Sequence, residues 1–196
     1  IEDAGDHKPA PWDLWLWNAV GVYNSGEYPD HIRSLLLDNN DAFDLGELEP
    51  LVDTVCDGVY ANRFTSGRKR IWTLFNATGH TVDRPLLKPE GSGDVHYVEL
   101  TTGRELALRD GQLSCRMRPQ STIAIAEYPR LLSLKDGKLQ VKEMPAGAKL
   151  VASDADGRKS VELTSGAPLP DLAGTDRIKL VGADGIVLDI RHRDSL

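Results

Sequence analysis

The spacing of apolar residues changes along the chain. In the first third, apolar residues recur every three or four positions, as on the buried stripe of an amphipathic helix. Residues 31–43 show this best, because Ile32, Leu35, Leu36 and Phe43 fall near one face. A proline stands at the start of this segment, where the first turn of a helix tolerates it. The pattern predicts a helix that ends at Leu45-Gly46.

After Pro50 the pattern changes to short runs of β-branched and aromatic residues bounded by Gly, Asn and Asp, which is typical of strands. We expect strands at residues 59–64, 70–76, 95–100, 105–108, 121–128, 149–153, 160–164, 177–181 and 186–191. Asp-Gly pairs begin at positions 57, 110, 136, 156 and 184, and each can adopt the positive φ of a tight hairpin turn. The fold class is therefore mainly β, with a short N-terminal helical segment.

Two breaks divide the pattern. The change from helical to strand spacing falls near Asp57-Gly58, and Tyr128-Pro129-Arg130 interrupts the strands, since proline is rare inside a central strand. A chain of 196 residues has room for one large domain or two small ones. We expect a helical segment at 1–56, an antiparallel β-sandwich at 57–130 and a second, small all-β (Ig-like) module at 131–196.

Charge and hydropathy exclude some partners. The 23 Lys and Arg residues against 30 Asp and Glu give a net charge of -7, whereas nucleic acids and anionic membranes attract a basic face. The longest apolar stretches, such as residues 121–126, fall far short of the roughly 20 residues that span a bilayer. We expect neither nucleic acid nor a membrane as a partner.

No compact catalytic motif is present: G-x-S-x-G, H-E-x-x-H, a Walker A loop and C-x-x-C are all missing. The five histidines are too scattered to place two metal ligands on one helix face. Two carboxylate pairs are considered for glycosidase chemistry, Glu47 with Glu49, and either of these glutamates with Asp13. Two glutamates in a solvated loop are far commoner than a catalytic pair. We therefore assign no catalytic residue, no metal ligand and no cofactor.

Aromatic residues supply the candidate binding site. Three of the four tryptophans gather at Trp12, Trp15 and Trp17, and flat rings match the apolar faces of sugars. Trp12, Trp15 and Tyr23 are the candidate glycan-binding residues. Since Trp12 and Trp15 stand one helical turn apart, packing in a core is the commoner role for such a pair.

Three further features have more than one interpretation. Cys56 and Cys115 can form a disulfide or stay as thiols. Residues 76–78 fit a glycosylation sequon, although a turn after Phe75 explains Asn76 equally well. Residues 154–157 are similar to a calcium loop, but Ala152 and Leu163 stand where that loop needs acidic ligands, so a hairpin turn is the better interpretation.

The β part resembles a known family. The segments 59–64, 71–76 and 97–105 are similar to the C-terminal β-sandwich of glycoside hydrolases with a TIM-barrel catalytic domain. In that family a strand ending in Asn, here Asn76, leads to a hairpin that carries a tryptophan, where this chain has Thr101. Residues 119–125 resemble the closing strand. The resemblance covers roughly residues 59–128.

The resemblance implies a location for the rest of the chain. Residues 11–43 resemble the final strand and helix of the barrel, and their apolar face is expected to cover the remaining barrel. A barrel takes typically ~250 residues, so its catalytic carboxylates would lie upstream of this chain. The chain, which begins at Ile1, is interpreted either as a mature secreted protein or, in preference, as the C-terminal piece of a longer protein.

The resemblance thus implies a noncatalytic C-terminal portion of a carbohydrate-active enzyme. Its partners would be an upstream catalytic domain, or a larger chain of the same protein, and polysaccharide. The parent would be a glycoside hydrolase, and we expect no activity from this chain alone. An extracytoplasmic or secreted location follows by analogy, because enzymes that degrade polysaccharides usually meet them outside the cell. The alternative is a stand-alone carbohydrate-binding or adhesive β-sandwich module.

Overall fold

The computed structural model describes residues 10–19, 29–67, 69–91, 93–135, 138–154, 160–163 and 177–192. The described elements are mainly strands, as the sequence predicts. In chain order the elements are α1 (Pro11–Trp17), α2 (Asp30–Asp38), α3 (Asn40–Phe43), β1 (Glu47–Val52), β2 (Val59–Ser66), β3 (Lys69–Asn76), β4 (Val82–Leu87), β5 (Val95–Glu99), β6 (Arg104–Leu106), β7 (Leu113–Met117), β8 (Thr122–Pro129), β9 (Leu132–Lys135), β10 (Lys138–Val141), β11 (Lys149–Ser153), β12 (Ser160–Leu163), β13 (Arg177–Val181) and β14 (Val187–His192).

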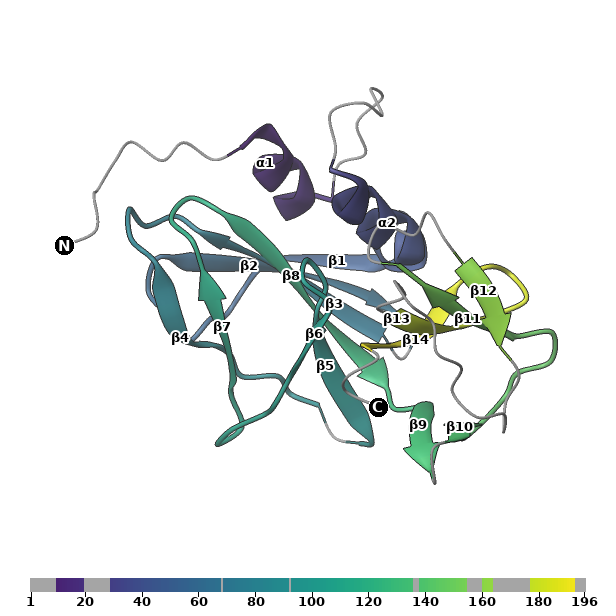
Figure 1. Cartoon of the computed structure of the whole chain (residues 1–196). Helices are drawn as coiled ribbons and strands as arrows, with labels where there is room; N and C mark the ends of the chain where they lie inside the picture. Colours follow the sequence, from purple (N-terminus) through teal and green to yellow (C-terminus); the bar gives the residue numbers. More distant parts are fainter. Residues whose placement is uncertain are drawn as a thin grey trace.

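The largest sheet has six antiparallel strands in the order β1-β2-β3-β8-β5-β6. The strand β8 lies between β3 and β5, so a segment far along the chain closes the centre of the sheet (Figure 1). Strands β4 and β7 pair with each other and form a second layer over one face. This arrangement confirms the predicted antiparallel β-sandwich.

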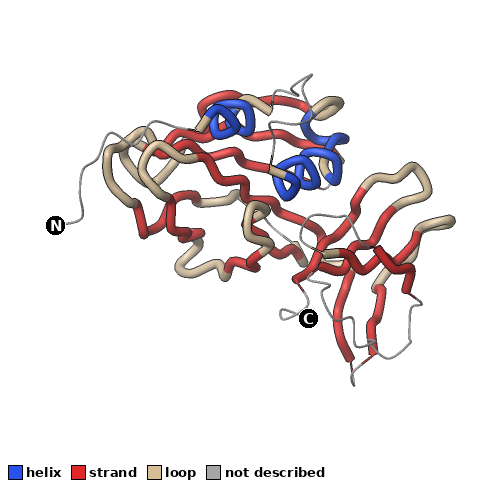
Figure 2. Tube along the Cα trace, turned by 45° about the horizontal axis from the view of Figure 1, so that its top comes forward, coloured by secondary structure: helices blue, strands red, loops and turns tan. Residues whose placement is uncertain are grey.

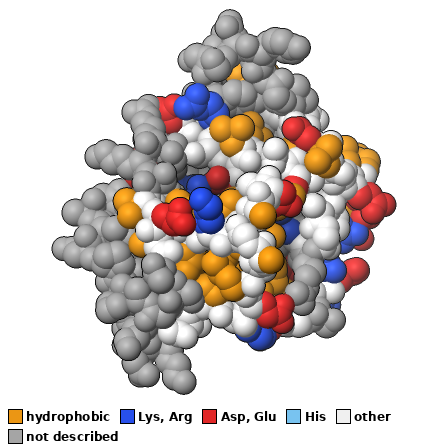
Figure 3. Space-filling model, turned by 90° about the vertical axis from the view of Figure 1, so that its right-hand side faces the viewer, with side chains coloured by type: hydrophobic (Ala, Val, Ile, Leu, Met, Phe, Trp, Pro, Cys, Tyr) orange, Lys and Arg blue, Asp and Glu red, His pale blue; other side chains and the backbone are white. Residues whose placement is uncertain are grey.

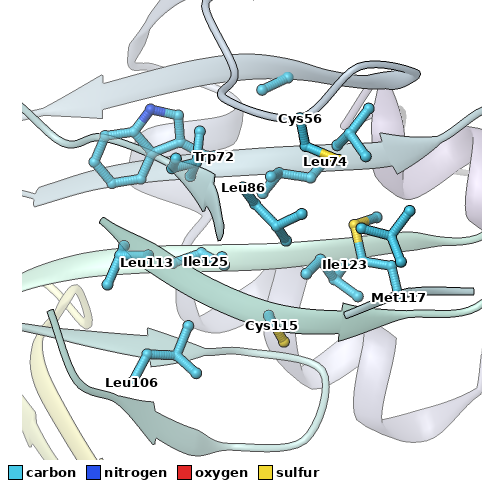
Figure 4. Close-up of a cluster of buried hydrophobic side chains, with 14 of the residues drawn as sticks. Cys56, Trp72, Leu74, Leu86, Leu106, Leu113, Cys115, Met117, Ile123 and Ile125 are labelled. Carbon is cyan, nitrogen blue, oxygen red and sulfur yellow. The ribbon is translucent and has the colours of Figure 1, made fainter. Parts of the chain in front are cut away.

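The first core lies between the six-stranded sheet and the β4–β7 pair (Figure 4). Alternate residues of β3 and β8 point into it, which is the period of two that a strand imposes. Its members include Trp72, Leu74 and Ile125 from the sheet and Leu113 and Met117 from β7.

Both cysteines belong to this first core and both are free thiols. Figure 4 shows the Cys56 side chain beside Leu74. The sulfur of Cys115 lies 3.7 Å from the guanidinium of Arg104. Burial is the main cause of a raised pKa at Cys115, because an apolar environment disfavours the thiolate. The structure therefore contains no disulfide between Cys56 and Cys115.

The helices cover the opposite face of the same sheet (Figures 1 and 2). Leu16, Ile32 and Leu35 are fully or nearly fully buried there, against Ile71 and Tyr128 among others. The expectation that the apolar face of residues 11–43 covers a barrel is therefore wrong for these residues. That face is buried on the chain's own sheet.

The predicted helix at residues 31–43 is divided into α2 and α3 at Asn39. The Asn39 side chain donates to the Leu35 carbonyl at 2.9 Å and accepts from the Tyr128 hydroxyl at 2.6 Å. Asparagine side chains compete with the helical backbone in this way, and the turn tightens as a result. Asn39 thus ends α2 and also ties it to the central strand β8.

Polar contacts fix α1 to the sheet. The buried carboxylate of Asp13 accepts from the Thr122 amide at 2.6 Å, and the Thr122 hydroxyl donates to the Asp13 carbonyl at 2.7 Å. At the other end of α1, the carbonyl of Trp17 accepts from Asn62 at 3.1 Å and from Thr73 at 2.8 Å. Burial raises the pKa of Asp13 despite these contacts. The helix α1 is therefore an integral layer of the sandwich.

The last third of the chain forms a four-stranded sheet, ordered β12-β11-β13-β14, and a β9–β10 pair. Leu132, Leu139, Leu150, Ile178 and Leu180 form its core. Val187 and Ile190 of β14 instead join the core under the helices. The second sheet therefore shares buried surface with the sandwich.

Buried ionic contacts also cross this junction. Asp189 lies 2.6 Å from His96 Nε2, and its second oxygen accepts from the backbone amides of Leu131 and Leu132 at 2.8 Å each. Lys179 donates to Asp38 at 2.5 Å. Contacts of this kind hold β14 and β13 against the sandwich and α2.

Candidate functional site

The structure places two of the three predicted glycan-binding residues. Trp12 and Trp15 lie in α1 and are both half-buried, and Trp12 packs against the core beneath the helices. Tyr23 lies outside the described residues. The ring of the neighbouring Trp17 meets Phe75 at 6.0 Å between centroids. Much of this aromatic surface therefore packs α1 against the sheet.

Exposed apolar side chains concentrate in one part of the chain. Of the ten large hydrophobic residues that the described part exposes, seven lie between positions 14 and 60. We call these the exposed apolar set: Leu14, Leu37, Leu45, Leu48, Leu51, Val55 and Tyr60. They lie on α1, α2, β1, β2 and the connections next to these elements. Leu37 and Leu45 are 66% and 84% exposed. These residues are neighbours in the sequence, and in space Leu14 and Leu37 lie in the helical layer, whereas the Val55 amide donates to the Leu86 carbonyl of β4 on the opposite side of the sheet.

A polar cleft lies on the face of the six-stranded sheet opposite the helices, beside the edge strand β1. Glu49 of β1 forms an ion pair with Arg63 of β2, directly across the strand pair. The next strand presents Trp72 opposite Arg63, so the indole closes the floor. The segment Leu87 to Glu90 forms the far wall, and the cleft has a volume of about 180 Å³.

A buried network supports this cleft. Glu127 is 3.3 Å from Arg70 and accepts from the Tyr97 hydroxyl at 3.0 Å. Burial and the nearby Glu127 carboxylate raise the pKa of Tyr97 well above its ordinary value. A Cβ on Gly91 would stand 2.6 Å from the Glu127 carboxylate and 3.0 Å from the Tyr97 hydroxyl, so a side chain there would require these two groups to shift. Glycine thus lets the wall segment lie directly against the network.

Asp13 is not brought together with either glutamate considered for glycosidase chemistry, whereas Glu47 and Glu49 stand two residues apart on β1. Asp13 is buried beneath the helices, where it binds Thr122. Glu49 faces the opposite side of the sheet with Arg63. Glu47 is exposed and pairs in register with Thr65. An acid and a nucleophile must face each other across one sugar, which Asp13 and either glutamate do not.

A second hollow, of about 380 Å³, lies where the sandwich meets the last sheet. Its walls are mostly apolar, and the buried ion pair between Lys69 and Asp41 lies at 2.5 Å among the lining residues. Lys69 also donates to the Val187 carbonyl at 3.2 Å. Burial is the main cause of a lowered pKa at Lys69. Figure 3 shows hydrophobic side chains gathered on the side of the molecule where β11 and β12 lie, with charged groups around them.

The remaining sequence motifs have structural roles or are not placed. Asn76 is fully buried, and its amide donates to the carbonyls of His80 and Arg118 at 2.9 Å each. The Asn76 oxygen accepts from Thr78, so the sequon residues form the predicted turn. Of the loop at 154–157, positions 155–157 lie outside the described residues. No group of three or more metal-ligating side chains occurs among the residues that are described. No described helix is long and apolar enough to cross a membrane.

Comparison with known proteins does not assign the chain to a family. No family model matches the chain, and no curated protein matches it. Among solved structures, the chain is similar to an α-amylase from Anoxybacillus, described as giving insights into a new glycosyl hydrolase subclass, with 18% identity and a TM-score of 0.37. The match covers 45% of this chain and 19% of the amylase, so the chain spans less than a fifth of that structure's length. A similarity of this size assigns neither a site nor an activity.

Proposed function

We propose that this chain is a noncatalytic β-sandwich portion of a glycoside hydrolase-like, carbohydrate-active enzyme, and that it packs on a catalytic barrel supplied by upstream sequence. The observation that carries the proposal is the exposed apolar set on α1, α2, β1 and β2. The resemblance of residues 59–128 to the sandwich of such enzymes supplies the class of partner. The chain's apolar stripe at residues 11–43 is already buried, so the contact falls to the outward side chains.

The outward side chains suit such a contact. Leu14 and Leu37 project from the two helices, while Leu48, Leu51 and Tyr60 lie on the two strands at the open edge of the sheet. Burial of apolar surface contributes roughly 25 cal/mol per Å² to association. Tyrosine is also enriched at the buried centre of protein interfaces.

The roles of the buried carboxylates favour a noncatalytic unit. Asp13 binds Thr122, Asp189 binds His96 and two backbone amides, and Glu127 binds Arg70 and Tyr97. Glu99 accepts from the backbone and hydroxyl groups of the two threonines that follow it. Each of these acids is thus engaged in holding backbone or neighbouring strands.

Mass spectrometry of the natural protein tests the proposal. We expect the 21.5 kDa sequence to be found within, or in a stable complex with, a larger chain that carries a barrel and hydrolyses glycosides. Such an enzyme would act on polysaccharide outside the cytoplasm. A lone monomeric chain of this mass would overturn the proposal, and glycan binding by that lone chain would favour the stand-alone module.

Substitutions test the surface. In the complete protein, Leu37→Ser and Tyr60→Ser should weaken the attachment of the sandwich to the barrel, which is measured as easier proteolytic separation of the two parts. Leu108→Ser is the matched control, because Leu108 is similarly exposed, at 47%, between β6 and β7. Equal behaviour of all three variants would contradict the proposed surface.

A further inference from the structure

The geometry points to an interaction surface along the edge strand β1 for a basic partner, one that presents Lys or Arg side chains among apolar ones. We call this the edge surface, and it consists of residues 44–57 together with Tyr60. That the partner is the upstream barrel rests on the proposed function. The chemistry that the partner needs follows from the edge surface itself.

Large apolar side chains of the edge surface are accessible. Leu45, Leu48 and Leu51 are 84%, 53% and 67% exposed, and Tyr60 is 50% exposed. Among the described residues β1 pairs only with β2, so its other side faces away from the sheet. Charge, proline and irregular geometry normally protect an edge strand from other chains, and β1 has all three. Exposed leucines add nothing to that protection, whereas exposed apolar residues with polar neighbours are typical of a contact surface.

The backbone of Leu51 is fixed although its side chain is exposed. Its φ is 54°, in the left-handed region that a leucine rarely adopts. The Leu51 amide donates to the Asn62 side chain at 3.1 Å, and Asn62 in turn donates to the Trp17 carbonyl. A partner therefore meets a leucine whose position is already set, which lowers the entropy cost of binding it.

A hollow of about 460 Å³ adjoins Leu51 at the end of the β1–β2 pair. Its lining includes Leu51, Val52, Tyr60 and two acids, Asp53 and Asp57. Both acids are exposed, and neither belongs to an ion pair within the described part of the chain. Lysine and arginine have an apolar stem and a charged end. The stem can pack on Leu51 and Tyr60 while the charge reaches either carboxylate.

Charge distinguishes a basic partner from a second copy of this chain. Residues 44–57 contain five acids, and no Lys, Arg or His occurs from position 34 to position 62. Of these five acids, Glu49 alone is ion-paired among the described residues, with Arg63. A symmetric dimer through this edge would place the same acids opposite each other, and like charges repel. Positive charge around apolar groups complements both features of the edge surface.

Titration of the full chain with an amphipathic peptide, lysine on one face and leucine on the other, tests the edge surface. Amide resonances report where the peptide binds, and we expect the largest changes at residues 44–60. A tenfold rise in salt concentration should weaken binding by about tenfold, because salt screens exposed charges. Asp53→Asn combined with Asp57→Asn should weaken it by about fivefold, and Leu51→Ser by about tenfold.

A matched control removes the same charge elsewhere. Asp83→Asn combined with Glu162→Gln changes exposed positions on β4 and β12, so the net charge of the chain changes equally. This control should leave peptide binding unchanged. Equal weakening by the control, resonance changes spread over the whole chain, or equally tight binding of a peptide with glutamate in place of lysine would overturn the basic partner.

The complete protein separates this inference from the docking proposal. There the Asp53 and Asp57 substitutions should ease proteolytic separation of the sandwich from the barrel, as Leu37→Ser does. If Leu37→Ser eases separation and the acid substitutions do not, the barrel docks and the basic partner is overturned. If the peptide binds as expected and no larger chain exists, the edge surface is supported and the barrel is not its partner.

Discussion

Asp189 is predicted to couple the last sheet to the sandwich, and Asp189→Asn is the sharpest perturbation of that coupling. Its side chain is fully buried and contacts His96 of β5 and the amides of Leu131 and Leu132. An asparagine of the same size can keep one oxygen for the two amides, but its NH₂ group can replace the other oxygen only if His96 Nε2 becomes the acceptor. The substitution therefore removes the charge from all three contacts and requires the His96 tautomer that leaves Nε2 without a proton.

The expected cost follows from the number and kind of contacts. A hydrogen bond to a charged group contributes about 1.5–3 kcal/mol, whereas one between neutral groups contributes about 0.5–1.5 kcal/mol. Contacts that share one carboxylate are not additive, so we expect a loss of about 1–3 kcal/mol rather than the sum over the contacts. The loss should fall on the junction first, because the cores of the two parts are left intact.

Urea unfolding followed by two probes measures this effect. All four tryptophans lie between positions 12 and 72, so fluorescence reports the helices and the sandwich only, whereas far-UV circular dichroism reports both parts. In the natural sequence the two transitions should coincide. In Asp189→Asn the circular dichroism transition should begin at lower urea concentration than the fluorescence transition.

A matched control uses Glu162→Gln in the last sheet, where the side chain is 64% exposed and its loss should change stability by less than about 1 kcal/mol. If Asp189→Asn behaves like this control, with coincident transitions and a comparably small change, the carboxylate does not couple the two parts.

Three further predictions concern the cores and the titrating groups. Leu16→Ala should destabilise the chain by about 2–5 kcal/mol in urea unfolding, because Leu16 is fully buried between α1 and the sheet. A change below about 1 kcal/mol would mean that α1 does not pack on the sheet. The folded-state pKa values of Tyr97 and Tyr128 are raised, so their contribution to stability is present below the unfolded value of about 10 and is lost as pH rises above it. Tyr97→Phe should therefore reduce the alkaline slope of the unfolding free energy by about 1.4 kcal/mol per pH unit, and an unchanged slope would contradict the burial of that hydroxyl. Cys56 and Cys115 should react with a thiol reagent only after unfolding, and rapid reaction of either thiol in the native protein would contradict their packing in the core.

Central strands could be predicted from the sequence because both faces of the sheet are covered. The runs at 59–64, 70–76 and 121–128 coincide closely with β2, β3 and β8, where the side chains alternate between two buried layers. Long apolar runs bounded by turn residues carry this information locally.

The edge strand β1 and the cover strands β4 and β7 were not predicted, whereas the edge strands β6, β12 and β14 were. The strand β1 reads as a polar loop, since it alternates Glu and Leu, contains Pro50 and is irregular between Glu49 and Val52 with a positive φ at Leu51. Proline and irregularity are typical of edge strands, which need to resist pairing with other chains. The strands β4 and β7 were likewise missed: β4 contains Pro85 and has an irregular burial pattern, and β7 buries only every second residue.

The candidate cleft could not be predicted because it depends on register. Glu49 and Arg63 are separated by 14 positions and meet only because β1 pairs with β2 in one alignment. A shift of one residue would turn Glu49 to the other face of the sheet. The contact between the sandwich and the last sheet is even harder to predict from the sequence, since His96 and Asp189 are 93 positions apart.

The burial of residues 11–43 on the chain's own sheet changes what the docking proposal requires. Had Leu16, Ile32 and Leu35 faced a barrel, the isolated chain would expose its main helical stripe and would fold poorly alone. Instead these residues complete the second core, and the carbonyl of Trp17 and the carboxylate of Asp13 are satisfied within the chain. The sandwich should therefore fold cooperatively without the barrel, so that its attachment depends on outward residues such as Leu37 and Tyr60, and docking can be disrupted without unfolding the sandwich.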